Sequence, residues 1–173
     1  MTACLVFFNG PSLYTYLSMP KRLTEIGCNY IESIRPTVDH VVCYDPEMRT
    51  QITQSPVKTY WCKNGHRSDT WRELCYPMID APQCSGTLAL RLAIQLKFDT
   101  IRILGCDWGH TEASVFQHRY DKFSPHKYSA SKVRQMDRWM KDRDIRVVSN
   151  HSLAFSTAPI STEDFYSWYN DWV

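Results

Sequence analysis

The chain has 173 residues, of which 43% are apolar and 22% charged, and its net charge is +2. This balance argues against intrinsic disorder and against a strongly basic nucleic-acid-binding protein, and the length suits one domain over residues 1–173. No apolar run approaches the roughly 20 residues of a membrane span, and the N-terminus lacks the charged start of a signal peptide. We therefore expect a cytoplasmic protein.

The cysteines form no pattern that predicts disulfides or a zinc site. Their number is odd, and none belongs to a C-x-x-C pair. Several lie within predicted strands, where a free thiol behaves as a small apolar side chain. We interpret them as reduced core thiols, in preference to a catalytic cysteine: Cys4, Cys28, Cys43, Cys62, Cys75, Cys84 and Cys106.

The first apolar run, residues 3–8, predicts a strand that is buried on both faces and therefore central. It leads directly into Asn9, Gly10, Pro11 and Ser12. Gly10 allows a tight turn, and Pro11 suits the first position of a helix. From these residues alone, a ligand loop with hydrogen bonds from Asn9 and Ser12 is as well supported as an ordinary turn between strand and helix.

Three further strands are predicted before residue 63. Residues 26–30 form a short one that ends near Asn29, residues 39–44 form a second, and residues 56–62 form a third. A helix is expected directly after Asp45, because proline follows it. Asp45 has two possible uses, contact with a ribose or cation and capping of this helix, and capping is the commoner one.

A buried helix is predicted over residues 88–96, which are apolar almost all round. Ser85 is its expected N-cap, and Gly86 lets the backbone approach a neighbour or a ligand closely. The polar residues of this segment, Thr87, Arg91 and Gln95, are spaced four residues apart, so we expect their side chains to form a narrow solvated stripe.

The helix is followed by a short buried strand, residues 101–104, and then by Asp107. In a parallel sheet the strand ends and the helix N-termini gather on one edge, where ligands bind. We expect Asp107 on that edge. The polar stretch 109–128 follows at the same edge, and long loops in that place are usually functional.

The C-terminal part predicts a surface helix over residues 129–143, a strand over 145–148 and a terminal helix that begins at Ser161. Strands and helices thus alternate along a single domain. The predicted fold class is α/β, a Rossmann-like domain with a mostly parallel central sheet and helices on both faces.

Four landmarks occur in a fixed order along the chain. They are Asn9-Gly10-Pro11-Ser12 after the first strand, Asn29, Ser85-Gly86 before the buried helix, and Gly105-Cys106-Asp107-Trp108 after the next strand. This order resembles that of the bacterial sialyltransferases of glycosyltransferase family 42, and of the related families that include archaeal 6-hydroxymethylpterin diphosphokinases. Further along, a histidine, a helix, an Ile-Arg-Val-Val strand and Asn-x-Ser-Leu are also similar to the family pattern.

In the sialyltransferases these segments line the pocket for the cytidine nucleotide of the donor. The resemblance therefore implies a nucleotide site that has Asp107 at its floor. The residues implied to contact the nucleotide are Asn9, Gly10, Ser12, Asn29, Ser85, Gly86 and Thr87, with Tyr120 as a candidate for a tyrosine that helps the donor phosphate leave.

The family histidine that matches His126 is the general base, so the resemblance implies that His126 and Asp107 form the catalytic part of the site. Imidazole suits a general base because its usual pKa lies near neutral pH. The chain departs from the family at Gly109, which stands where the sialyltransferases have one of their two phosphate-assisting tyrosines.

The sequence thus predicts a transferase, most simply a sialyltransferase-like glycosyltransferase with a nucleotide-sugar donor and no required cofactor or metal. A diphosphokinase-like enzyme is one alternative; it would need magnesium, for which Asp45 and Asp107 are the acids at strand ends. A protein that binds a nucleotide without turnover is another, and Gly109 favours it. In each case the partner is a small-molecule nucleotide, with no nucleic acid and no membrane span, and the oligomeric state is not predicted.

Overall fold

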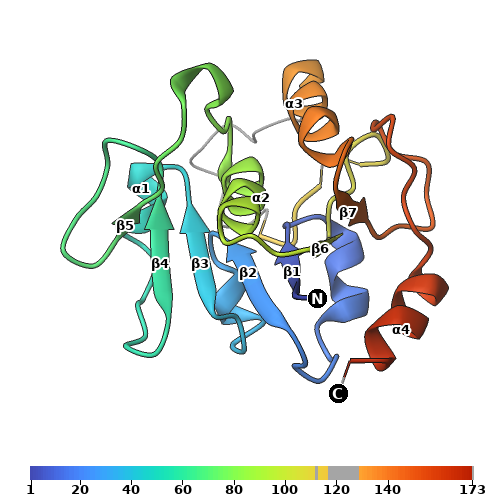
Figure 1. Cartoon of the computed structure of the whole chain (residues 1–173). Coiled ribbons are helices and arrows are strands. Elements are labelled where there is room, and N and C mark those ends of the chain that lie inside the picture. The colour runs from blue at the N-terminus through green and yellow to red at the C-terminus, as the bar shows by residue number, and fades with distance from the viewer. Residues whose placement is uncertain (112, 117–128, 173) are drawn as a thin grey trace.

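The computed structural model describes residues 1–111, 113–116 and 129–172. Within these residues seven strands form one parallel sheet in the order β5-β4-β3-β2-β1-β6-β7 (Figure 1). The strands are β1 Ala3–Phe7, β2 Thr24–Cys28, β3 His40–Cys43, β4 Thr59–Cys62, β5 Arg72–Glu73, β6 Thr100–Leu104 and β7 Asp144–Val147. The predicted parallel α/β fold is confirmed.

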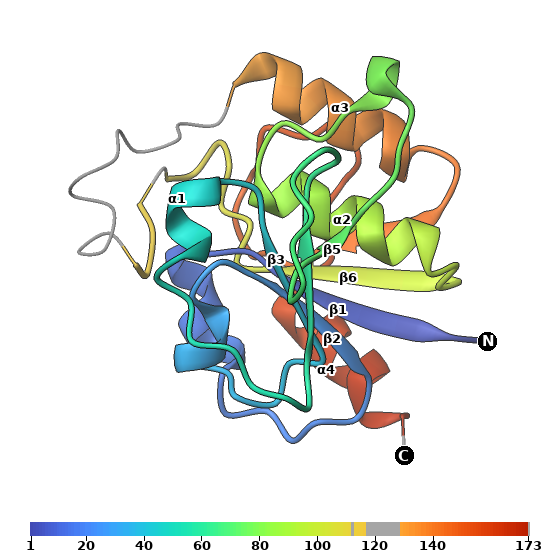
Figure 2. The same cartoon turned by 90° about the vertical axis from the view of Figure 1, so that its left-hand side faces the viewer.

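Helices cover both faces of the sheet, as predicted. Figure 2 shows α2 and α3 on one face, and η1 and α4 on the other. No helix in the described ranges is long and apolar enough to cross a membrane. The α-helices are α1 Pro46–Arg49, α2 Ser85–Gln95, α3 Ala130–Met140 and α4 Thr162–Asn170; the 3-10 helices are η1 Pro11–Tyr16, η2 Ile31–Ser33 and η3 Met78–Asp80.

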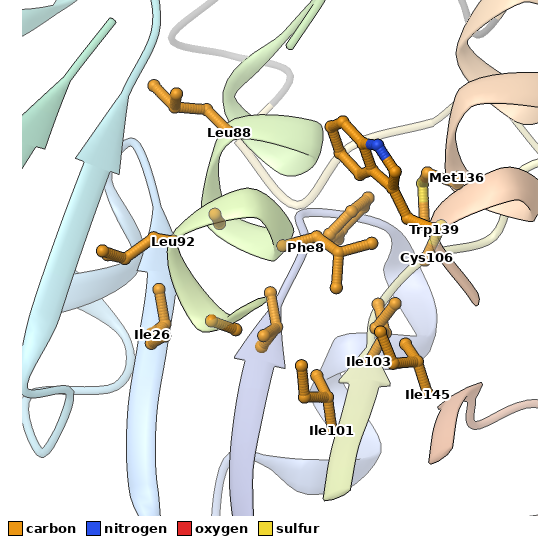
Figure 3. Packing of buried hydrophobic residues seen from close by; sticks show 14 of the residues in the cluster. Phe8, Ile26, Leu88, Leu92, Ile101, Ile103, Cys106, Met136, Trp139 and Ile145 are labelled. Atoms are coloured by element: carbon orange, nitrogen blue, oxygen red, sulfur yellow. The ribbon is translucent and has the colours of Figure 1, made fainter. Parts of the chain in front are cut away.

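The central strand β1 supplies both halves of the hydrophobic core. Side chains alternate across a strand, so Val6 packs on the α2 side of the sheet while Leu5 and Phe7 pack on the η1 and α4 side. Figure 3 shows the first of these halves, with Leu92 of α2 and Trp139 of α3 closing over the strands. Burial on both faces favours an apolar side chain at every position, which explains the sequence of β1.

β1 and β6 pair in parallel along their whole length, from Ala3 opposite Thr100 to Phe7 opposite Leu104. The predicted strands over residues 3–8 and 101–104 are therefore confirmed to within one residue at each end. Their carboxyl ends lie side by side, so the segments that follow them meet at one edge of the sheet.

The start of α2 differs from the expectation in two respects. Cys84, not Ser85, is the N-cap, and it forms a capping box with Thr87. The Thr87 hydroxyl accepts from the amides of Gln83 and Cys84 at 2.9 and 3.1 Å, and its side chain is fully buried. The predicted solvated stripe is wrong at Thr87, because this hydroxyl satisfies the helix start instead of facing water. Arg91 is also partly covered, since its guanidinium lies over the Trp139 ring.

Two other predicted caps have different outcomes. Asp45 occupies the N-cap position of α1, but its side chain makes no capping hydrogen bond, so the capping interpretation is wrong. Ser161 caps α4 by accepting from the amide of Asp164 at 3.0 Å, as predicted. α1 has a single turn and proline at its start, so a cap bond matters less there.

The seven cysteines are free thiols, and most of them are buried. Burial raises the pKa of Cys28 and Cys106 well above the usual value, so both stay protonated at neutral pH. Cys75 is exposed, which departs from the interpretation that all of them are core residues.

Candidate functional site

The strand order places a topological switch point between β1 and β6. From β1 the chain adds strands in one direction as far as β5, and it then returns to the opposite side of β1 to add β6 and β7. In open parallel sheets, ligands bind outside the carboxyl ends of the strands at such a point. The segments after Phe7 and after Leu104 are therefore the first place to look for a site.

These two segments are bonded to each other. The amide of Phe8 donates to the carbonyl of Leu104 at 2.8 Å, and the amide of Gly10 donates to that of Gly105 at 2.7 Å. The Asp107 carboxylate then accepts from the backbone amide of Ser12 through Oδ2, at 2.9 Å. The structure thus brings together three of the predicted site residues, Gly10, Ser12 and Asp107.

Gly10 is required by close packing. A Cβ atom added there would overlap Asp107 Oδ2 and lie 2.6 Å from the carbonyl oxygen of Gly105. One of these neighbours is backbone, and the other is a carboxylate held by Ser12, so neither moves away easily.

Replacing Gly10 with alanine is expected to destabilise the protein. The added methyl group must push the loop away from Asp107, and overpacking of this kind typically costs about 1–3 kcal/mol. Urea unfolding of Gly10→Ala and wild type measures this difference. Equal midpoints and slopes would show that the two segments are not held together as described.

Asp107 is 3% exposed, and its second oxygen, Oδ1, has no hydrogen-bond partner among the described residues. The hydroxyl of Ser12 is also buried without a partner in this part of the chain. A buried polar atom left unpaired costs about 1–3 kcal/mol. Two such atoms, on residues joined by a hydrogen bond at the switch point, favour a polar ligand or water that bonds to them.

A second group of predicted residues lies at the start of α2. Asn29 follows β2 with a φ of +55°, a conformation that asparagine tolerates better than most residues. The hydroxyl of Ser85 donates to Asn29 Oδ1 at 2.7 Å and accepts from the amide of Tyr44 at 2.9 Å. Segments that follow β2 and β3 are thus joined to the N-terminus of α2.

Gly86 connects the two groups. A Cβ atom there would lie 2.6 Å from the ring of Phe8, the residue before Asn9, so the absence of a side chain lets α2 pack on this ring. Asn9 itself accepts from the amide of Val115 through its backbone carbonyl, at 2.8 Å. Hence Asn9, Gly86 and their neighbours lie along one edge of the sheet, on either side of Phe8.

Thr87 and the residues of the polar stretch have other placements. Thr87 is buried within the cap of α2, where its hydroxyl is fully used by the backbone. His126 and Tyr120 lie outside the described residues, as does most of the predicted loop over 109–128. Their predicted roles stay predictions.

Two residues that are not among the predicted site residues, Lys63 and Tyr44, are linked to the start of α2. The Lys63 ammonium lies 4.3 Å from the centre of the Tyr44 ring, and Tyr44 is bonded to Ser85 through its backbone. Burial raises the pKa of Tyr44, which keeps its hydroxyl neutral. Tyr44 directly follows β3, and Lys63 directly follows β4. This position at a strand end is the feature of the sequence that could have pointed to them.

Gly109 has a φ of +97°, which disfavours any other residue, and a Cβ atom there would overlap the backbone nitrogen of Ala154. The amide of Ala154 in turn donates to the carbonyl of Trp108 at 2.8 Å. The place where the family resemblance expects a tyrosine is therefore closed to any side chain by the segment after β7.

No group of three or more histidine, cysteine or acidic side chains suited to a metal ion occurs within residues 1–111, 113–116 and 129–172. A wide pocket of about 670 Å³ lies beside β5, lined by charges of both signs and by Trp71. None of the predicted site residues that the structure describes lines it. The switch point, not this pocket, carries the candidate site.

Two solved structures share this fold. The first is the sialyltransferase CstII from Campylobacter jejuni in complex with the substrate analogue CMP-3FNeuAc, with a TM-score of 0.52 and 16% identity over 86% of this chain and 79% of that chain. The second is the sialyltransferase CST-II in complex with a trisaccharide acceptor and CMP, with a TM-score of 0.54 and 13% identity over 99% of this chain and 100% of that chain.

No protein-family model matches the chain, and no curated protein matches it. At these identities the structural likeness establishes a sialyltransferase-like fold. The likeness extends over nearly the whole chain, so the fold is shared as a complete unit.

Proposed function

We propose that this protein is a sialyltransferase-like glycosyltransferase that binds a nucleotide-activated sugar at the carboxyl edge of β1 and β6. The observation that carries the proposal is the hydrogen-bonded Asp107–Ser12 pair at the switch point, because Asp107 Oδ1 and Ser12 Oγ are buried and lack a hydrogen-bond partner among the described residues. The two solved sialyltransferase structures of this fold are complexes with CMP or a CMP-sugar analogue, which makes a cytidine nucleotide the first candidate.

The reaction needs three things from the protein. It must hold the donor, remove the proton from an acceptor hydroxyl, and stabilise the phosphate as the bond between sugar and phosphate oxygen breaks and the bond to the acceptor oxygen forms. The residues proposed to hold the donor are Asn9, Gly10, Ser12, Asn29, Ser85 and Gly86. His126 is proposed as the general base on the strength of the family resemblance.

A second candidate function is nucleotide binding without turnover. The observation in its favour is Gly109, because the overlap with Ala154 leaves no room for the tyrosine of the family pattern. The two candidates share the binding site and differ in whether a donor is consumed.

CMP is expected to raise the melting temperature of the wild-type protein. A ligand present at a hundred times its Kd stabilises the native state by about 2.7 kcal/mol. Replacing Ser85 with alanine removes the hydroxyl that joins Asn29 to Tyr44, and we expect CMP affinity to fall about tenfold. Thermal unfolding with increasing CMP measures both effects.

The exposed Ser156 provides a matched control, since Ser156→Ala should leave the CMP-induced shift unchanged. If CMP and a panel of other nucleotides and nucleotide-sugars produce no shift in the wild type, the nucleotide site is refuted. If Ser85→Ala responds to CMP as the wild type does, the start of α2 is not part of the site.

A further inference from the structure

His110 and His151 form a stacked pair of imidazole rings. Their centres are 3.7 Å apart, and the two ring planes are inclined by only 5°. Both side chains are exposed. The two residues come from different segments, one after β6 and one after β7, so the pair spans neighbouring strand ends at the same edge as Asp107.

The stack is not explained by ring attraction. Aromatic rings prefer offset or edge-to-face arrangements to a direct face-to-face one, and an exposed pair gains little from burial. Two protonated imidazoles at this spacing would also repel each other unless an anion lay beside both. The arrangement must therefore come from the segments that carry the rings.

These segments are held firmly on both sides. The amide of His110 donates to the carbonyl of Asp107 at 2.9 Å, and the amide of His151 donates to the hydroxyl of Ser149 at 3.0 Å. Between them, Trp108 accepts from the amide of Ala154, and its ring packs 6.0 Å from that of Phe155. The backbone thus fixes the two imidazoles next to each other.

We propose that the His110–His151 pair binds a phosphate group, as a subsite of the nucleotide site. Each imidazole has an N–H donor in either protonation state, and with ring centres 3.7 Å apart, donors of both rings are close enough to bind oxygens of one phosphate. An anion bonded to both rings also removes the repulsion between them when they are protonated. The pair lies one turn of chain beyond Asp107, where the phosphate of a nucleotide held by Asp107 and Ser12 would be within reach.

The phosphate subsite would supply the hydrogen-bond donor to the phosphate that a glycine at position 109 cannot provide. No side chain fits at position 109, whereas His110 places a donor at the adjacent position. That the phosphate belongs to a nucleotide rests on the proposed function; that the pair binds phosphate rests on its own geometry.

The test uses the side-chain NMR resonances of His110 and His151, assigned with His110→Asn and His151→Asn. The wild-type protein is titrated with CMP, with cytidine and with inorganic phosphate, at an ionic strength kept constant with sodium chloride. We expect CMP to shift both resonances saturably and cytidine to leave them in place. Either variant should weaken CMP binding about tenfold or more and leave cytidine binding unchanged. The control His66→Asn should bind CMP as the wild type does.

CMP binding that is equal in wild type and both variants, or that leaves both resonances unmoved, would overturn the phosphate subsite while sparing the proposed nucleotide site. If neither CMP nor cytidine binds, the nucleotide proposal fails, and inorganic phosphate decides the subsite alone. A saturable shift of both resonances then supports it, and a shift no larger than that of His66 overturns it.

Discussion

Replacing His126 with alanine is expected to lower turnover by at least about a hundredfold and to leave the CMP-induced rise in melting temperature nearly unchanged. Removing a general base typically costs about 10²–10⁴-fold in rate, whereas the residues proposed to hold the donor lie elsewhere in the chain. Steady-state rates and thermal unfolding of the same protein samples measure the two effects.

His118→Ala is the control, because this histidine belongs to the same polar stretch but has no match to the family base. It should change the rate much less. A His126→Ala variant as active as the wild type would remove His126 from the mechanism. A variant that also fails to bind CMP would make it a binding residue instead.

Replacing Arg35 with methionine is expected to lower the free energy of unfolding by about 3–5 kcal/mol, because it leaves the carboxylate of Glu25 buried without its cation. Arg35 forms an ion pair with Glu25, and both side chains are almost completely buried. Its guanidinium also donates to the backbone carbonyls of Leu17 and Met19 at 2.9 and 2.6 Å. Urea unfolding gives the difference.

The matched control is the ion pair of Lys21 with Asp39, whose side chains are 36% and 38% exposed. Solvent screens a pair of this kind, so Lys21→Met should cost no more than about 1 kcal/mol. Comparable losses for Arg35→Met and Lys21→Met would contradict the view that burial makes the Glu25 pair important.

The sheet could be predicted because its strands are buried on both faces. Residues 3–8 are short and apolar throughout, and residues 101–104 are apolar except for Arg102; such runs are typical of central parallel strands. Their pairing followed from the fold class. Ser161 could be predicted as a cap because serine is followed at the third position by Asp164. The apolar strand run and the serine cap are both patterns of a few neighbouring residues.

Interactions between distant segments could not be predicted in this way. Ser85 looks like an N-cap by residue type, but Cys84 occupies that position. The Ser85 hydroxyl donates a hydrogen bond to Asn29, which lies 56 residues earlier in the chain. No local pattern indicates that Glu25 and Arg35 are buried together. Likewise, nothing in the segment around His110 predicts contact with His151.

The candidate site falls between these two cases. Placing Asp107 at the strand edge needed only the fold class, and the structure adds the bond from Asp107 to Ser12 and the overlap that makes Gly10 necessary. Thr87 shows the limit of the approach. It stands beside two candidate site residues in the sequence, yet its hydroxyl is used within the helix cap.

The central claim is that the protein transfers a sugar from a nucleotide donor, and a turnover measurement tests it most directly. Wild-type protein is incubated with CMP-linked sialic acid and related nucleotide-sugars, each with a panel of oligosaccharide acceptors, and the products are followed by mass spectrometry. We predict release of CMP together with an acceptor that has gained one sugar, at a rate that falls at least about a hundredfold in His126→Ala. Donors that bind, as shown by a rise in melting temperature, but are left intact with every acceptor would contradict the enzyme and support binding without turnover.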